Sequence, residues 1–308
     1  MNYKAESLNR LDFPLKFGDR PCRIYGTDCA EYLLLQMTDE HELQHMDNEI
    51  SAIAQGSAHS FLFAAVPVKS WNDELSPWES PAVWGKESFG GNAAGTLRFL
   101  TEQAIPTLKK QFALPENVRI ILGGYSLAGL FALWASTQTA LFSGVAAASP
   151  SVWFPGWMEF EQQHPIQAQC IYLSLGDREE HTKNTVMATV GDNIRTLHSR
   201  LAERGADCTL EWNSGGHFKE AALRTARAFQ WANDIPEMDD AACRRLKRCR
   251  RIYHQAVGKG LPQRCVCHHS ICNEIPRNGT VGCTEGWKSG ILQSPLIILN
   301  ERDCATSL

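Results

Sequence analysis

The chain has 308 residues, of which 44% are hydrophobic, and its formal net charge is −4. This length and apolar content suit one large domain, or one domain of about 200–250 residues with an appendage. The small net charge gives no signal of nucleic-acid binding by the chain as a whole. No apolar run approaches the roughly 20 residues of a membrane span, and residues 1–10 lack the apolar core of a signal peptide. We therefore expect a soluble cytoplasmic protein that binds neither membranes nor nucleic acid.

Composition divides the chain near residue 237. Residues 1–237 carry 28 acidic and 19 basic side chains, whereas residues 238–308 carry 6 acidic and 11 basic ones. The first region has four widely spaced cysteines, mostly in apolar contexts, which indicates buried reduced thiols. The other seven cysteines crowd into the second region. We predict a folded domain over residues 1–237 and a basic, Cys-rich segment of unknown structure over residues 238–308.

Strand-like and helix-like stretches alternate through the first region. Two early strands are predicted at Cys22–Gly26 and Glu31–Met37, an amphipathic helix at Glu40–Ala54, and a buried strand at Ser60–Val68. Residues 69–92 form a long irregular stretch rich in Trp, Pro and Gly, and loops of that length are usually functional or disordered. Its tryptophans argue against disorder. A helix is predicted next, over Ala93–Lys110.

A serine follows the next predicted strand. The apolar run Val118–Gly123 leads into Gly124-Tyr125-Ser126-Leu127-Ala128-Gly129, and a helix is predicted over Leu127–Thr139. Strand, sharp turn with a central serine and helix are the context of a nucleophile elbow, in which the turn lifts the hydroxyl out of the sheet. The motif is G-x-S-x-A-G rather than G-x-S-x-G. We predict that Ser126 is a nucleophile; the alternative is a glycine-rich turn with an incidental serine.

The remaining elements continue the alternation. Strands are predicted at Gly144–Ala148, Cys170–Leu175 and Cys208–Asn213, and helices at Thr185–Arg204 and Phe218–Asn233. This order predicts an α/β fold with a mostly parallel central sheet and helices on both of its faces. Such sheets place their chemistry at the carboxyl ends of the strands.

Reactive residues follow these strands in the order serine, acid, histidine. A serine hydroxyl needs an adjacent base, and that base needs an orienting acid. We predict His217 as the base, because it follows the last strand and the flexible pair Gly215-Gly216; the alternative is a histidine on a solvated loop. The acid stays open. Reach favours Glu179, closeness to the strand favours Asp177, and Glu180 is a third candidate.

Other parts of a serine-hydrolase site can be placed by position. The backbone N–H of Leu127 should contribute to the oxyanion hole, together with an N–H from the loop after Ser60–Val68, where Lys69 to Trp71, and Ser70 and Trp71 above all, are the candidates. Candidates to line a substrate pocket are Trp71, Trp78, Tyr125 and Trp153. For the tryptophans, plain packing of the loop against the domain is the alternative.

Four segments carry a resemblance to a known family. Gly123–Ala132, Ser149–Trp153, Gly176–Glu179 and Gly215–His217 resemble the esterase branch of the α/β-hydrolases that includes esterase D-like enzymes and enterochelin (siderophore) esterases. The resemblance spans roughly residues 20–235. It implies a three-layer α/β-hydrolase sandwich and serine-dependent hydrolysis of small-molecule carboxylic esters without a metal or cofactor. The short chain before the first predicted strand favours a general esterase over a dedicated siderophore esterase.

Two other functions fit the same residues. A non-catalytic α/β-hydrolase-fold protein would keep the pocket for binding, although an intact serine, acid and histidine argue against that. An acyltransferase would share the acyl-enzyme and differ in its acceptor. The sequence indicates neither the natural substrate nor the oligomeric state.

The Cys-rich segment departs from the family. Cys265-Val-Cys267-His268-His269-Ser-Ile-Cys272 clusters zinc-binding residue types, yet its spacing is not common in structural zinc sites. Disulfides would require export, and the basic run around Cys243 and Cys249 is a weak candidate for an anionic surface. We interpret residues 238–308 as a poorly ordered tail or a fused or frameshifted terminus, and assign them no metal and no function.

Overall fold

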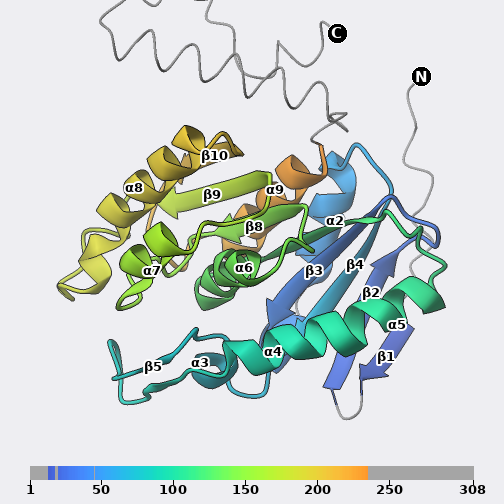
Figure 1. Cartoon of the computed structure of the whole chain (residues 1–308), viewed down its shortest axis with the longest axis horizontal. Helices are drawn as coiled ribbons and strands as arrows, with labels where there is room; N and C mark the ends of the chain where they lie inside the picture. Colours follow the sequence, from blue (N-terminus) through green and yellow to red (C-terminus); the bar gives the residue numbers. More distant parts are fainter. Residues whose placement is uncertain (1–12, 18–19, 45, 235–308) are drawn as a thin grey trace, which may run out of the picture. The chain divides into compact units, whose positions relative to one another are not determined.

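The computed structural model describes residues 13–17, 20–44 and 46–234 (Figure 1). The boundary expected at residue 237 and the Cys-rich segment 238–308 lie outside these residues, as do residues 1–10. Within the described ranges, no helix is both long enough and apolar enough to cross a membrane.

A central sheet of eight strands organises the described part of the chain, in the order β1-β2-β4-β3-β7-β8-β9-β10. The strands are β1 (Phe13–Phe17), β2 (Arg20–Gly26), β3 (Tyr32–Thr38), β4 (Phe61–Pro67), β7 (Arg119–Tyr125), β8 (Gly144–Ala148), β9 (Cys170–Gly176) and β10 (Asp207–Asn213). Strand β2 runs antiparallel to β1 and β4, and all other neighbours are parallel. The mostly parallel sheet is as predicted, and it brings the ends of β7, β8, β9 and β10 to one edge.

Helices cover both faces of this sheet (Figure 1). One face carries α1 (Glu40–Gln44), α2 (Asp47–Gly56) and α9 (Ala221–Asn233); the other carries α4 (Ala93–Phe99), α5 (Ile105–Gln111), α6 (Leu127–Gln138), α7 (Trp157–Gln163) and α8 (Val190–Glu203). The two-residue period of the strands divides the core. On β3, Leu33 and Leu35 pack on the α6 side, whereas Tyr32 and Leu34 pack on the α9 side.

The helix predicted over Glu40–Ala54 is wrong in one respect, because it is two helices. The predicted apolar face is correct, since Leu43, Met46, Ile50 and Ile53 are all buried. The break is explained by Arg23 of β2. Its guanidinium donates to the carbonyl of Leu43 at 2.9 Å, a group that a continuous helix would use, and it binds the Asp47 carboxylate at the start of α2.

The helix predicted over Ala93–Lys110 is helical along its length, but a π-helical turn over Leu100–Ala104 separates α4 from α5. Pro106 explains the wider turn, because it offers no N–H to the carbonyl one turn earlier.

Two other elements differ from the sequence-based expectation. Strand β1, at the edge of the sheet, is an element that sequence reasoning missed. The predicted helix Thr185–Arg204 is also shorter, with a 3₁₀ turn, Met187–Thr189, before α8.

The stretch 69–92 has little regular structure but fixed anchors. It contains the short helix α3 (Trp71–Glu74) and the antiparallel pair β5 (Glu79–Ser80) and β6 (Phe89–Gly90). The Trp78 indole N–H donates to the Pro155 carbonyl at 3.0 Å, and the Asn184 side chain donates to the Val83 carbonyl at 2.7 Å. These bonds tie the stretch to the segments that follow β8 and β9.

One buried carboxyl should make the stability of the fold depend on pH. Burial of Glu49 on α2, opposed by a hydrogen bond from Gln36 and assisted by the charge of Glu42, raises the pKa of its carboxyl to about 8. The folded state therefore holds this proton up to about pH 8, whereas the unfolded chain loses it near 4.5, the ordinary pKa of a glutamate side chain. Across that window the free energy of unfolding should fall by about 1.4 kcal/mol per pH unit.

We expect Glu49→Gln to remove this loss, so that its stability relative to wild type increases between pH 5 and pH 8. Urea denaturation at both pH values measures the change. Glu159→Gln is the matched control, because Glu159 holds the same third position in its helix, α7, and is exposed. Equal slopes for wild type and Glu49→Gln would contradict the prediction.

Candidate active site

Ser126 lies in the sharp turn between β7 and α6, and the predicted strand and helix are present on either side of it. Its φ of 56° is in the left-handed region, which costs a non-glycine residue about 1–3 kcal/mol. Three backbone hydrogen bonds hold the turn: the Ser126 N–H donates to Ala148 at 3.1 Å, and its carbonyl accepts from Leu130 at 3.1 Å and Ser151 at 3.0 Å. The neighbouring strand and the first helical turn therefore offset the strain.

Small residues allow the chain to approach itself closely around this turn. A Cβ at Gly124 would lie 2.6 Å from the Ala128 Cβ, and one at Gly129 would lie 3.2 Å from Pro150. The turn, the helix and the segment after β8 can pack together only because these positions carry no side chain.

The side chains of Ser126, His217 and Glu179 form a line of hydrogen bonds. Ser126 Oγ lies 3.0 Å from His217 Nε2, and His217 Nδ1 lies 2.7 Å from Glu179 Oε2. The three residues follow β7, β10 and β9 respectively, so the shared carboxyl edge of the parallel strands brings them together. The Glu179 side chain is only 5% exposed and that of His217 is 27% exposed. This arrangement can pass a proton from the serine hydroxyl to an oriented imidazole.

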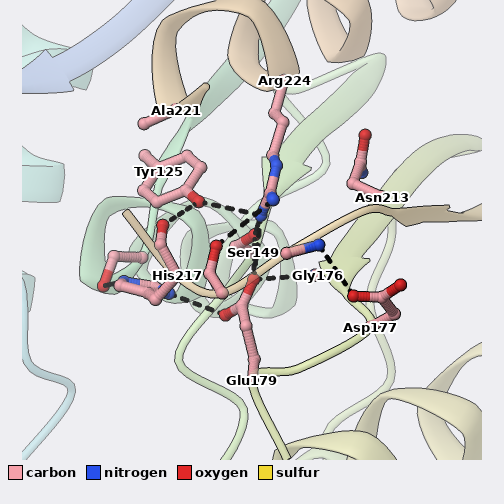
Figure 2. Close-up of polar contacts among 12 residues, drawn as sticks. Tyr125, Ser149, Gly176, Asp177, Glu179, Asn213, His217, Ala221 and Arg224 are labelled. Carbon is pink, nitrogen blue, oxygen red and sulfur yellow. Dashed lines mark hydrogen bonds and ion pairs between the residues drawn. The ribbon is translucent and has the colours of Figure 1, made fainter. Parts of the chain in front are cut away.

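The two other candidate acids lie elsewhere. Asp177 Oδ1 accepts the N–H of Gly215 at 2.7 Å, so it holds the loop before His217 rather than the imidazole. Glu180 forms an ion pair with Arg195 at 2.8 Å. Of the three carboxylates considered from the sequence, the structure brings Glu179 against His217 (Figure 2).

The second oxygen of Glu179 is also fully engaged. Oε1 accepts hydrogen bonds from the Gly176 N–H at 2.7 Å, the Ser149 hydroxyl at 2.8 Å and the Arg224 guanidinium at 3.1 Å. Sequence reasoning missed Arg224, which lies on α9 and is 0% exposed. A signal was available: Arg224 shares a helical face with Ala221 and Ala228, and a charged residue among small apolar ones at that spacing indicates a buried charge.

Tyr125 has a different position from the one expected. Its ring is buried, its hydroxyl donates to the backbone carbonyl of His217, and Arg224 donates to the same hydroxyl at 3.3 Å. Burial raises the pKa of Tyr125, so the hydroxyl stays protonated and able to donate. Tyr125 therefore supports the histidine loop, and nothing places it as a wall of a substrate pocket.

The three tryptophans expected near the substrate are all half-buried and pack against the core. Trp78 packs on Phe154 and Phe160, with ring centroids 5.7 and 5.2 Å away, and Trp153 packs on Phe89, with centroids 6.3 Å apart. Trp153 also lies two residues after Ser151, whose hydroxyl lies 3.3 Å from Ser126 Oγ.

The backbone donors proposed for an oxyanion hole also differ from one another. Leu127 begins α6 directly after Ser126, so its N–H lies at the unpaired end of the helix. The Ser70 N–H donates to the buried Glu74 carboxylate at 3.1 Å, as does that of Lys69 at 2.8 Å. Trp71 begins α3, where the first N–H groups lack an intrahelical partner. Among the described residues, no group of three or more Cys, His, Asp or Glu is placed to hold a metal ion.

Comparisons with known proteins identify the family and the fold. The family model described as "Putative esterase" matches residues 38–234. An IroE-like serine hydrolase from Shewanella oneidensis superposes with a TM-score of 0.60 at 12% identity, covering 80% of this chain and 92% of that one. The siderophore hydrolase EstA from Aspergillus nidulans gives 0.55 at 17% identity, covering 72% and 92%.

The enterobactin esterase FES from Shigella flexneri gives a TM-score of 0.52 at 17% identity, covering 68% of this chain and 54% of that one. No curated protein sequence matches the chain. At such low identities these structures show the fold, and the expected three-layer α/β-hydrolase sandwich is confirmed.

The close approach at β7 generates a test of the site's framework. A Cβ at Gly123 would lie 2.6 Å from the Phe229 ring and 2.7 Å from the Ala146 carbonyl oxygen. That oxygen belongs to the backbone of the neighbouring strand, so it cannot move away without disturbing the sheet. We expect Gly123→Ala to lower the free energy of unfolding by about 1–3 kcal/mol, as overpacking does. Gly216→Ala is the control, because its Cβ would meet nothing within 4 Å. Equal thermal stability of the two variants would contradict this account.

Proposed function

Because the chain belongs to this esterase family and is an ester-hydrolysing enzyme, we propose that it is a serine hydrolase that cleaves carboxylic esters through an acyl-enzyme. Ser126 is the nucleophile, His217 the general base and Glu179 the acid that orients it. One observation carries the proposal: hydrogen bonds of 3.0 and 2.7 Å link Ser126 Oγ, the two imidazole nitrogens and the Glu179 carboxylate in one line.

The reaction follows from this order of groups. His217 Nε2 accepts the hydroxyl proton as Ser126 Oγ attacks the ester carbonyl, and Glu179 stabilises the imidazolium that forms. The tetrahedral intermediate collapses, the imidazolium gives its proton to the departing alcohol oxygen, and the acyl group stays on Ser126. Water, deprotonated by the same imidazole, then attacks the acyl-enzyme and releases the carboxylic acid.

The negative oxygen of the intermediate needs donors that are fixed in advance. We propose the N–H of Leu127 and the N–H of Trp71 for this role. Ser70, the other expected donor, already bonds Glu74, and this contact instead fixes the loop that carries Trp71. The Glu74 carboxylate is itself held by an ion pair with Arg20 at 2.6 Å.

The substrate is proposed to be a small-molecule ester. Two of the similar structures described above are a siderophore hydrolase and an enterobactin esterase, so siderophore-type esters belong in the set of substrates to be tested beside simple alkyl esters. Trp71, Trp78 and Trp153, all half-buried, remain the candidates to line the pocket. A cytoplasmic location stays a prediction from the sequence.

Hydrolysis of p-nitrophenyl esters from acetate to octanoate tests the proposal. We expect Ser126→Ala and His217→Ala each to lower kcat/KM by about 1,000-fold or more, because the residues act as one unit. Glu179→Gln should lower it by about 100-fold or more, since the imidazolium loses its partner. The matched control is Asp177→Asn, which changes a carboxylate of the same loop and should keep most of the rate.

Other outcomes would assign the site differently. A larger loss in Asp177→Asn than in Glu179→Gln would contradict Glu179 as the acid. If folded wild type hydrolyses none of these esters, labelling with a fluorophosphonate decides: no labelling of Ser126 would overturn the enzyme proposal and favour a binding protein.

A further inference from the structure

A buried arginine lies behind the proposed catalytic residues. The Arg224 side chain is 0% exposed, and a charge in that environment is costly unless it is well paired. Its Nη1 lies 3.1 Å from Glu179 Oε1, 3.3 Å from the Ser149 hydroxyl and 3.3 Å from the Tyr125 hydroxyl. Figure 2 shows the guanidinium reaching from α9 into the space between these three side chains.

The other end of the guanidinium binds the loop that carries His217. Arg224 Nη2 donates to the carbonyls of Ser214 and Gly216, each at 3.2 Å. Tyr125, which accepts from Arg224, donates to the carbonyl of His217 itself. This loop contains two consecutive glycines and would otherwise be free to adopt many conformations. Arg224 thus contacts the acid directly and the histidine through its backbone.

We infer that Arg224 is a positioning residue of the active site: it fixes one oxygen of Glu179 and the loop before His217, so that Glu179 Oε2 and His217 Nδ1 meet. The inference rests on the proposed function. It assigns Arg224 no contact with substrate and no proton transfer.

The hydrogen-bond pattern at Glu179 explains why this position needs a cation. Three donors converge on Oε1, and that leaves Oε2 directed at the imidazole. Two of the donors, Gly176 and Ser149, are neutral. Arg224 is the donor that carries a positive charge, and it forms a 3.1 Å ion pair with the 5%-exposed carboxylate. It is also the donor that binds Ser214 and Gly216, so it sets the acid and the histidine loop relative to each other.

A positioning role differs from a merely structural one in what a substitution changes. Arg224→Lys keeps the charge, but a single ammonium cannot span the acid and both loop carbonyls. We expect it to lower kcat by about 10–100-fold with little change in KM, because a small misplacement of reacting groups can cost up to about 100-fold in rate. Arg224→Ala should be more impaired, and added guanidinium ion should restore part of its kcat by entering the vacated space.

The control is Arg227→Met on the same helix. Arg227 is partly exposed and bonds Asn213 and Glu211, away from His217. The Arg227→Met substitution should leave kcat unchanged even if it lowers the melting temperature. Circular dichroism and active-site titration normalise every rate to folded protein.

Proton NMR provides a readout that needs no turnover. The Nδ1 proton shared by His217 and Glu179 should give a far-downfield signal in wild type and in Arg227→Met, and this signal should be lost or shifted in Arg224→Lys. A folded Arg224→Lys with wild-type kcat and an unchanged signal would overturn the inference. The inference would also be overturned if the rates of the Arg224 variants fell only in proportion to the fraction of unfolded protein and guanidinium ion did not restore kcat in Arg224→Ala. If wild type proves inactive towards esters but the signal still depends on Arg224, the proposed function fails, while the contact between Glu179 and His217 is still shown to depend on Arg224.

Discussion

The Glu179 carboxylate is the group on which the arrangement of the site depends. It is almost completely buried, so both of its oxygens must find donors. Those donors come from the end of β9, the end of β8, the loop after β10 and helix α9. One desolvated carboxylate therefore joins the ends of β8 and β9 to the segment that runs from the loop after β10 into α9. The geometry at His217 follows from satisfying that charge, because the imidazole occupies the one position that the other donors leave.

A second constraint acts on the nucleophile side. Ser126 adopts a left-handed backbone conformation. The chain around it packs closely because Gly124 and Gly129 carry no Cβ that would meet their neighbours. Gly123 faces Phe229 of α9, the helix that also carries Arg224. Close packing of α9 on β7 thus serves both halves of the site: it needs glycine on the strand, and it brings the arginine within reach of Tyr125 and Glu179.

Sequence reasoning identified most of the sheet and the serine turn, because apolar runs and glycine-rich turns are local signals. It could not choose between Asp177 and Glu179, since both follow β9 and the choice depends on the turn in which the Glu179 N–H bonds the Gly176 carbonyl. It joined α1 and α2 because the interruption comes from Arg23 on a distant strand. The helical face of Arg224 indicates a buried charge, but its partners lie 8 to 99 residues away, so its role at the site could not be read locally.

The anchoring of residues 69–92 has a consequence for how such an enzyme can diversify. The stretch is fastened at Trp78 to Pro155 and at Val83 to Asn184, while its connection to β4 is fixed by Glu74. None of these fastenings uses Ser126, His217 or Glu179. Substitutions and small insertions between the fastened points can therefore reshape the surface offered to an incoming molecule without disturbing the reactive groups. Under the proposal that this stretch lines the pocket, substitutions there can alter substrate preference while Ser126, His217 and Glu179 keep their arrangement.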